Sequence, residues 1–363
     1  MNEPDYSQIL SHFSIDLPIK PFGNGHINST FRVGEPPRYI LQKINTAVFT
    51  DPEGLMKNIT AVTDHLRKKI AEAGGDPARG TLTFLPTDEG RFFYRDQSGN
   101  CWRVYRFVGD SHVFEAATPE LFGESARAFG QFQKLLSDFP AESLCETIPR
   151  FHDTAARLEQ LREAIAENKS GRADEVGEEI EFAFARAGET DTIVAALQKG
   201  EIPLRVTHND TKLNNVLFDD QTGKTLCVID LDTVMPGSLL YDYGDALRFG
   251  ASTAAEDETD LSRVQFDLDL FRAYTDAYLE TLAGSITARE IELLPMGAKL
   301  ITLECGMRFL ADHVNGDVYF RIHRENQNLD RARTQFKLVA DMESKWREMQ
   351  GIVARASANF CGL

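Results

Sequence analysis

Between residues 206 and 233, four polar side chains occur at intervals suited to chemistry on a phosphate group. In chain order they are His208, Asp210, Asn215 and Asp230. An apolar run follows Asn215, a turn is expected at 219–224, and a strand at 225–229 leads into Asp230. A carboxylate can accept the proton of an attacking hydroxyl, while an amide and a second carboxylate can hold Mg²⁺ on phosphate oxygens. The chemistry that this stretch predicts is phosphoryl transfer.

The spacing follows the pattern of a kinase catalytic loop, H-x-D-x-x-x-x-N, then a hairpin and a metal-binding Asp. We therefore expect Asp210 to be the catalytic base and Asn215 and Asp230 to be the metal ligands. His208 is expected to brace the loop rather than carry a proton. The alternative is that Asp210 and Asn215 only cap turns, where both residue types are common. All four residues in this order favour the catalytic interpretation.

The elements that position this loop begin with a glycine turn between two expected strands, over residues 22–33. The amides of Gly23 and Gly25 could close over nucleotide phosphates, because glycine allows close approach. A plain hairpin turn is the alternative. The next strand, 38–44, carries Gln42 where protein kinases place a phosphate-binding lysine. Lys43 should point to the opposite face, so we expect phosphate binding without that lysine.

The alternating strand expected at 101–108 ends at a glycine and would lead into the hinge of a two-lobed kinase. Arg106 and Val108 are therefore candidate nucleotide-binding residues, together with Gln42. The boundary between lobes is expected near residues 107–110, which divides the chain into 1–108 and 109–363.

The chain beyond this boundary shows mostly helical periodicity, so the expected fold class is α+β. Asp242 and Asp245 are expected to cap a helix and hold the catalytic loop, while Asp232 could touch a second Mg²⁺ or brace the loop. Arg308 and Tyr319 are polar residues that pattern alone assigns to the surface or to packing. The expected helices before the boundary are 7–13 and 51–73. After it we expect helices at 120–139 and several within 155–200, followed by amphipathic helices at 270–282, 287–312 and 329–354.

The composition is that of an ordinary globular protein of 363 residues, with 42% hydrophobic residues and a formal net charge of −17. An acidic surface repels nucleic acid and anionic membranes, so neither is an expected partner, and no obligate protein partner is indicated. The five cysteines show no C-x-x-C spacing and indicate reduced thiols. The first residues, MNEPDYSQIL, do not resemble a signal peptide. We therefore expect a cytoplasmic location.

The motifs HNDTKLNN, IDLD and YDYGDALR resemble the aminoglycoside phosphotransferase and choline kinase group. The stretches GNGHINSTF, RYILQKINTAVF and ECGMRFLADH are similar to its N-acetylhexosamine 1-kinase branch. The resemblance implies a protein-kinase-like two-lobed fold, with an N-terminal antiparallel-sheet lobe that binds the nucleotide and a larger, mostly helical C-terminal lobe that carries the catalytic and sugar-binding residues. It further implies transfer of phosphate from ATP, with Mg²⁺, to the anomeric 1-hydroxyl of N-acetylglucosamine or N-acetylgalactosamine.

By the same resemblance, His26, Arg308 and Tyr319 contact the sugar beside Asp210. Arg and Tyr side chains can donate hydrogen bonds to sugar hydroxyls and to an N-acetyl carbonyl. Two alternatives stay open. One is a kinase of the same fold with another acceptor, such as choline, an amino alcohol, an aminoglycoside or another sugar; the other is a catalytically inactive kinase-like binding protein. A protein kinase is disfavoured because no A-P-E motif follows Asp230.

Overall fold

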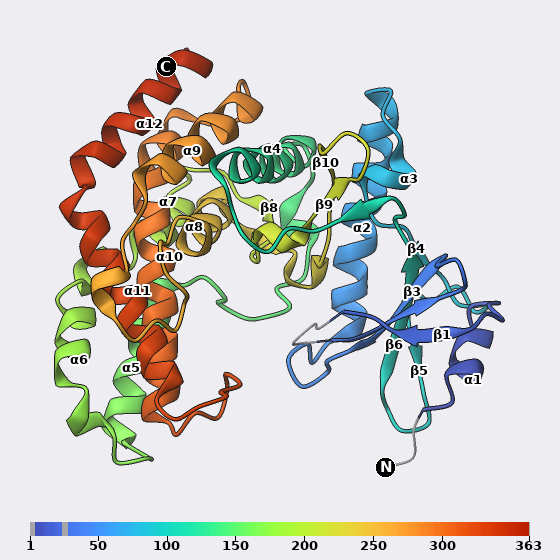
Figure 1. Ribbon diagram of the computed structural model, residues 1–363, viewed down its shortest axis with the longest axis horizontal. Helices are drawn as coiled ribbons and strands as arrows, with labels where there is room; N and C mark the ends of the chain where they lie inside the picture. Colours follow the sequence, from blue (N-terminus) through green and yellow to red (C-terminus); the bar gives the residue numbers. More distant parts are fainter. Residues whose placement is uncertain (1–3, 24–27, 363) are drawn as a thin grey trace. The chain divides into compact units, whose positions relative to one another are not determined.

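A computed structural model describes residues 4–23 and 28–362. The chain forms two compact units, and Figure 1 labels their helices and strands. The N-terminal unit comprises Met1–Val113, Asp138–Pro149 and Asn215–Pro236. The C-terminal unit comprises Phe114–Ser137, Arg150–Asn214 and Gly237–Leu363. The predicted functional division into 1–108 and 109–363 stays a prediction.

The N-terminal unit is built on an antiparallel six-stranded sheet among the described residues, in the order β1-β2-β3-β6-β4, with β5 also paired to β6. In β3, Gln42 lies opposite Thr30 of β2 and Arg103 of β6, which places these three side chains on one face. The strands are β1 (Ile19–Pro21), β2 (Ser29–Val33), β3 (Tyr39–Ile44), β4 (Phe84–Leu85), β5 (Tyr94–Arg95) and β6 (Cys101–Arg106).

A short helix, α1 (Tyr6–Ser11), packs with the residues after it on the other face of this sheet (Figure 1). Ile9, Leu10 and Phe13 are buried there against Leu41 and Trp102. Burying one such side chain contributes about 1.5–3 kcal/mol relative to leaving it in water. This cluster therefore stabilises the central strands on which Gln42 and Arg103 stand.

The long helix α2 (Pro52–Glu72) begins where its sequence predicts. The Asp51 carboxylate accepts a hydrogen bond from the Gly54 amide at 3.0 Å, and Pro52 occupies the first turn. The short helix α3 (Pro77–Gly80) follows. A second, three-stranded antiparallel sheet in this unit joins β7 (Ser111–His112), β9 (Val216–Asp219) and β10 (Thr225–Val228), and β11 (Met235–Gly237) comes later.

The C-terminal unit is mainly helical, and its central element is α10 (Ala288–Val314). Its helices are α4 (Pro119–Leu135), α5 (Thr154–Glu167), α6 (Gly177–Phe184), α7 (Thr192–Gln198), α8 (Leu239–Gly250), α9 (Leu268–Leu282), α10, α11 (Gln327–Ser344) and α12 (Trp346–Phe360), with the strand β8 (Arg205–Thr207). Single 3-10 turns occur in the two units at η1 (Ala141–Ser143), η2 (Ala173–Glu175), η3 (Ala187–Glu189), η4 (Leu213–Asn215), η5 (Leu231–Thr233) and η6 (Leu261–Arg263).

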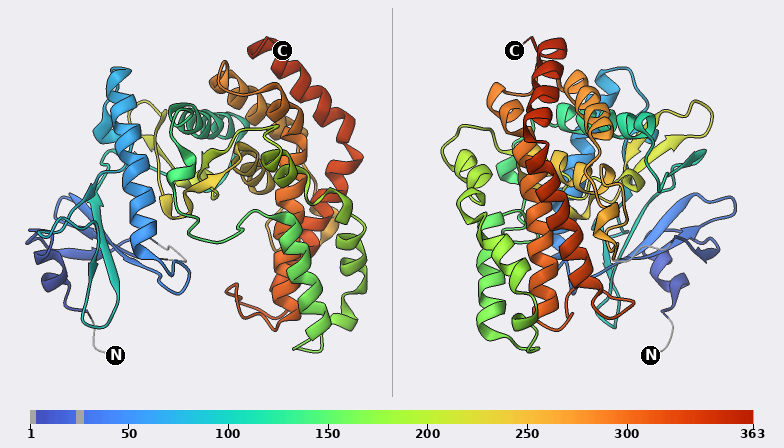
Figure 2. Two further views of the ribbon diagram at one scale, coloured as in Figure 1. Left: turned by 180° about the vertical axis from the view of Figure 1, so that it is seen from behind. Right: turned by 60° about the vertical axis from the view of Figure 1, so that its left-hand side comes forward.

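Helix α10 packs against α5, α8, α11 and α12, and Figure 2 shows α10 and α11 side by side from two directions. Because neighbours cover most of its surface, α10 is buried nearly all round, and the prediction of an amphipathic helix is wrong here. It meets α8 at two glycines: a Cβ on Gly244 would lie 2.4 Å from the Gly297 carbonyl oxygen. This close approach brings α8, which carries the loop anchors described below, firmly onto α10.

The predicted helix 329–354 is two helices, because the chain breaks at Lys345. The Lys345 ammonium donates to the Phe266 carbonyl and to Asp341, both at 2.8 Å. The contact with Phe266 is tertiary, so helical periodicity does not reveal it. The α+β fold class, with an N-terminal antiparallel sheet and a larger helical part, is confirmed. Among the described residues, no helix combines the length and the apolar character that crossing a membrane requires.

Candidate active site

The catalytic loop leaves β8 in the C-terminal unit and is held by a buried carboxylate of α8. The backbone N–H groups of His208 and Asn209 both donate to Asp242, at 3.0 and 2.7 Å. Gln133 donates to the same carboxylate at 2.6 Å. Burial raises the pKa of Asp242 above its ordinary value, although these donors favour the charged form. One side chain therefore sets the backbone path just before Asp210.

Asp245, one turn further along α8, holds the next part of the loop. Its carboxylate accepts from the Thr211 backbone N–H at 2.8 Å and pairs with Arg248 at 3.1 Å. Burial raises the pKa of Asp245, but Arg248 and Lys212 outweigh that effect and lower it. The prediction that Asp242 and Asp245 hold the loop is confirmed. The prediction that they cap the helix is wrong, because the Ser238 side chain is the N-cap of α8.

His208 is fully buried, with its ring edge against Phe129 and Phe132 at centroid distances of 5.4 and 5.9 Å. The Asp210 backbone N–H lies 3.2 Å from His208 Nδ1 and donates to it. A histidine enclosed in this way braces the loop. The structure thus agrees with its interpretation as a brace and not as a proton carrier.

The Asp210 side chain is 25% exposed, in contrast to the buried residues on both sides of it. It pairs with Lys212, whose Nζ lies 2.7 Å from Asp210 Oδ1. Burial lowers the pKa of Lys212, but attraction to Asp210 and Asp245 raises it on balance. The sequence analysis missed Lys212; a cation two residues after the proposed base is the signal that could have revealed it.

The proposed metal ligands belong to the N-terminal unit and lie at the two ends of the β9–β10 hairpin. The backbone joins these ends, because the Ile229 N–H donates to the Asn215 carbonyl at 2.9 Å. Asp230 is exposed and adopts a left-handed backbone conformation, with φ 59° and ψ 59°. The Asp219 side chain stabilises the hairpin turn, because its carboxylate accepts a hydrogen bond from the Thr222 N–H at 2.7 Å.

These residues fit Mg²⁺ that is shared with phosphate groups. Within residues 4–23 and 28–362, no three His, Cys, Asp or Glu side chains form a cluster able to hold a metal ion. Mg²⁺ in nucleotide sites is commonly held by one or two protein oxygens, with phosphate and water completing its six ligands. One amide, Asn215, and one carboxylate, Asp230, match that requirement.

Asp232, two residues past Asp230, is a brace. It is 4% exposed, its Oδ1 lies 2.5 Å from the Arg103 guanidinium, and its Oδ2 accepts from the Asn28 amide at 2.6 Å. Arg103 also donates to Gln42 Oε1 at 2.8 Å. The two carboxylate oxygens of Asp232 are thus engaged within the N-terminal unit, which favours the bracing role over a second metal. Arg103 was missed because it lies within an apolar strand.

The described nucleotide-binding candidates, Gly23, Gln42, Arg106 and Val108, all belong to the N-terminal unit. Gln42 also donates to Thr30 at 3.1 Å, so both ends of its amide are engaged. Gly23 is exposed, with φ 74°. Arg106 is exposed, and the carbonyl of buried Val108 accepts from Ser111 at 2.8 Å. Gly25 and His26 lie outside the described residues. The nucleotide-binding role of these residues stays a prediction.

The structure brings Arg308 and Tyr319 together in the C-terminal unit, around the ring of Phe320. The Arg308 guanidinium lies 5.5 Å from the Phe320 centroid and 5.1 Å from that of Phe151. The Tyr319 ring, 62% exposed, meets Phe320 edge-on at 4.8 Å. Burial, followed by repulsion from Arg308, lowers the pKa of Arg157. Two guanidinium groups and an exposed phenol therefore share one region, and Arg157 is a further residue that the sequence analysis missed.

Comparison with known proteins places the fold among phosphotransferases. A model described as "APH: Phosphotransferase enzyme family" matches residues 18–283. A microcompartment-associated aminopropanol kinase is 16% identical, with TM-score 0.59 over 95% of this chain and 98% of that one. An aminoglycoside phosphotransferase from Alicyclobacillus acidocaldarius is 14% identical, with TM-score 0.62 over 98% of both chains.

A choline/ethanolamine kinase family protein from Mesorhizobium loti has a similar structure as well. It is 18% identical, with TM-score 0.56 over 93% of this chain and 92% of that one. At these identities, the likeness to the three solved structures shows the fold.

Proposed function

Because the chain belongs to the phosphotransferase enzyme family, we propose that it is an N-acetylhexosamine 1-kinase. It transfers the γ-phosphoryl group of ATP to the anomeric 1-hydroxyl of N-acetylglucosamine or N-acetylgalactosamine. The O–H bond of the acceptor breaks and its proton passes to Asp210, a new bond forms between that oxygen and the γ-phosphorus, and the bond from the γ-phosphorus to the bridging oxygen of ATP breaks; the products are the sugar 1-phosphate and ADP.

The observation that carries the proposal is the way the catalytic loop holds Asp210. Anchors on both sides are buried, yet the Asp210 carboxylate keeps an exposed face. In this position it orients the anomeric hydroxyl and accepts its proton as the bond to phosphorus forms. The anomeric hydroxyl is more acidic than an ordinary alcohol, so a carboxylate base suffices. The Lys212 ammonium stabilises the carboxylate and offsets negative charge as the phosphate approaches.

The nucleotide half of the reaction is assigned to the N-terminal unit. Asn215 and Asp230 hold Mg²⁺, which supplies positive charge to the phosphate oxygens of ATP. Gly23 and Gln42 are proposed to lie near the nucleotide, together with Gly25, Arg106 and Val108. Residues 1–108 are proposed to bind the nucleotide, and residues 109–363 to supply the base, the sugar site and the metal ligands Asn215 and Asp230.

The charge around Arg308 supports a neutral acceptor. Arg157 and Arg308 lie close enough to repel each other; the carboxylates of Glu304 and Asp153 act in the opposite direction, but Glu304 is engaged by His152 and Thr154, and Asp153 by Arg150. A region with two guanidinium groups disfavours choline, amino alcohols and aminoglycosides, all of which are cations. It suits a sugar whose hydroxyls and N-acetyl carbonyl accept hydrogen bonds from Arg308 and Tyr319. His26, outside the described residues, is proposed as a third sugar contact.

The product of the reaction tests the proposal directly. The purified protein is mixed with Mg²⁺, ATP and N-acetylglucosamine, and the product is examined by phosphorus–proton NMR. We expect phosphate coupled to the anomeric proton. Phosphate on the 6-hydroxyl would keep the kinase activity but refute the 1-kinase assignment. If no product forms, a panel with N-acetylgalactosamine, other sugars, choline, aminopropanol and an aminoglycoside distinguishes another acceptor from an inactive binding protein.

The base is tested by Asp210→Asn, which keeps the shape of the side chain and removes its basicity. Turnover should fall by about 10²–10⁴-fold, the contribution typical of a general base. The melting temperature, and its increase on adding Mg²⁺ and ATP, should stay close to wild type. Asp269→Asn is the matched control, because Asp269 is 81% exposed on α9. Wild-type turnover in Asp210→Asn would show that the base is another residue.

A further inference from the structure

The segment between α10 and α11 exposes two large apolar side chains in succession. Val318 is 78% exposed and Tyr319 is 62% exposed, and Phe320 follows them. We refer to Val318, Tyr319 and Phe320 as the aromatic tip. Connecting segments are usually among the more mobile parts of a fold. In the aromatic tip, in contrast, the backbone N–H of every residue donates a hydrogen bond to a side chain.

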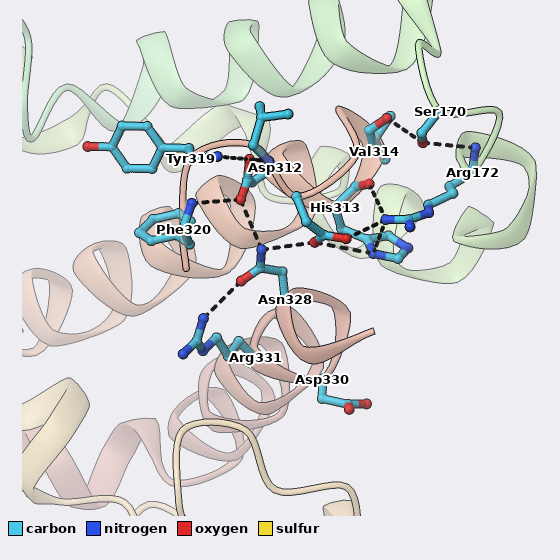
Figure 3. Close-up of polar contacts among 12 residues, drawn as sticks. Ser170, Arg172, Asp312, His313, Val314, Tyr319, Phe320, Asn328, Asp330 and Arg331 are labelled. Atoms are coloured by element: carbon cyan, nitrogen blue, oxygen red, sulfur yellow. Dashed lines mark hydrogen bonds and ion pairs between the residues drawn. The ribbon is translucent and has the colours of Figure 1, made fainter. Parts of the chain in front are cut away.

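A single carboxylate, Asp312, holds the backbone of the aromatic tip (Figure 3). Its Oδ1 accepts from the N–H groups of Val318 at 3.0 Å and Tyr319 at 2.8 Å, and its Oδ2 accepts from Phe320 at 2.9 Å. Asp312 itself is 5% exposed, near the end of α10. Three successive amides that point at one buried anion form a nest. This arrangement fixes the direction in which each of the three side chains leaves the backbone.

Asn328, on α11, completes the anchor. It is fully buried, and its Nδ2 donates to Asp312 and to Asp317, both at 2.9 Å. Arg172 pairs with the other oxygen of Asp317 at 2.5 Å. An amide at position 328 satisfies two carboxylates at once, whereas a third carboxylate there would repel both. The polar groups behind the aromatic tip therefore form a specific, mutually paired set, as Figure 3 shows.

The surface that this anchor holds in place carries the groups proposed to meet the acceptor. The Phe320 ring packs on Phe309 at a centroid distance of 4.6 Å, and Arg308 lies over it. The Tyr319 ring points away from Asp312 and stays exposed (Figure 3). An exposed aromatic side chain on a rigid backbone, beside a guanidinium, is suited to binding a small polar molecule because little freedom is lost on binding.

The anchor is also joined to the catalytic loop through charged side chains of the C-terminal unit. From Asn328 the contacts pass in order through Arg331, Glu256, Arg248, Asp245 and Thr211. The longest step is 3.8 Å, from Arg331 Nε to Glu256 Oε2. Asp210 directly precedes Thr211. The same polar chain thus meets both the aromatic tip and the loop that carries the proposed base.

We propose that Asp312 and Asn328 are positioning residues. They hold the aromatic tip in a fixed position relative to the catalytic loop, as a preformed part of the acceptor site. The proposal rests on the proposed function, since it takes the acceptor to be the molecule that Tyr319 meets. It assigns to two residues with no direct sugar contact a role in acceptor affinity.

The first test is Asp312→Asn, which keeps the size of the side chain but turns one acceptor into a donor. The KM for N-acetylglucosamine should rise roughly tenfold to a hundredfold, the range expected when a binding group is displaced by about an ångström. The KM for ATP should stay within about twofold, because nucleotide binding is proposed for residues of the N-terminal unit. Asp341→Asn is the control: Asp341 also anchors a backbone amide, that of Phe266 at 2.7 Å, but away from the aromatic tip.

A double-mutant cycle separates positioning from general damage. In a Tyr319→Ala background, Asp312→Asn should change the acceptor KM no further, because the group that it positions is already absent. If the two effects multiply, Asp312 does not act through Tyr319 and the proposal is wrong. Should Asp312→Asn fail to fold, Asn328→Ala removes the amide bridge while keeping the three backbone hydrogen bonds, and the same cycle is run with it.

Hydrogen exchange supplies a readout that needs no activity. Amides 318–320 should exchange roughly tenfold faster in Asp312→Asn than in wild type or Asp341→Asn, because their acceptor is disturbed. Unchanged exchange would refute the anchoring. If the wild-type protein phosphorylates another acceptor, only the 1-kinase assignment is refuted, and the KM measurements are then made with that acceptor. If Asp312→Asn accelerates hydrogen exchange at 318–320 but leaves the KM for that acceptor unchanged, the proposal that the anchor positions the acceptor site is refuted.

Discussion

Replacing Arg103 with methionine should destabilise the N-terminal unit strongly. The Arg103 side chain is 2% exposed and that of its partner Asp232 is 5% exposed, so the ion pair is almost fully removed from water. Methionine keeps much of the apolar stem of arginine but has neither its charge nor its hydrogen-bond donors. The variant therefore leaves a buried carboxylate without its cation, together with a Gln42 oxygen that has lost its donor.

The expected loss follows from these contacts. Breaking a buried ion pair by removing one partner costs about 3–5 kcal/mol. The Asn28 amide still donates to Asp232 at 2.6 Å, which moves the loss toward the lower end of that range. The Gln42 oxygen that has lost its donor increases the loss of stability, since an unsatisfied buried polar group costs about 1–3 kcal/mol. We expect a decrease of about 3–5 kcal/mol in the free energy of unfolding.

Urea unfolding, without nucleotide or metal, measures this loss. Lys20→Met is the matched control, because it breaks an ion pair with Glu35 in which both side chains are 69% exposed; it should cost about 0–1 kcal/mol. The double variant Arg103→Met, Asp232→Asn should recover much of the stability, since no buried charge remains. An Arg103→Met variant no less stable than Lys20→Met would refute the argument that this buried pair braces the unit.

Two further predictions concern the β9–β10 hairpin. Asp230→Asn keeps a residue type that tolerates the left-handed backbone at φ 59°, so we expect unchanged thermal stability but a higher Mg²⁺ concentration for half-maximal activity; an unchanged Mg²⁺ requirement would remove Asp230 from the metal ligands. Hydrogen bonds from Thr222 and the Arg79 guanidinium lower the pKa of Asp219 from 3.8 to about 2. The charged form stabilises the fold above the ordinary pKa, and this stabilisation is lost as the pH falls from about 4 toward about 2. The difference in melting temperature between wild type and Asp219→Asn should therefore shrink over that range, and a constant difference would contradict this account.

Local features were accessible from the sequence because they depend on spacing within one segment. The Asp51 cap and Pro52 at the start of α2 follow from rules on neighbouring residues. The catalytic loop and the β9–β10 hairpin likewise span only residues 206–230, and their turn and strand signals predicted the order of elements that the structure shows. The change of periodicity near residue 108 predicted mainly strands before that point and mainly helices after it, which is the order of elements that the structure shows.

The tertiary structure determined the contacts between segments that are distant in the sequence. Asn28 and Asp232 are 204 residues apart, and Gln42 and Arg103 are 61 apart, so no local pattern joins them. Lys345, where the predicted helix 329–354 breaks, donates to the Phe266 carbonyl, 79 residues away.

The amino-acid sequence alone therefore determined the chemical groups of this protein and the segments that carry them, because short-range spacing and capping act within a few residues. Only the tertiary structure decided that Asp232 braces the sheet, that Arg308 and Tyr319 share one region, and that Asp312 holds the aromatic tip. The physical reason is that a buried charge needs a partner, and folding determines which distant residue supplies it.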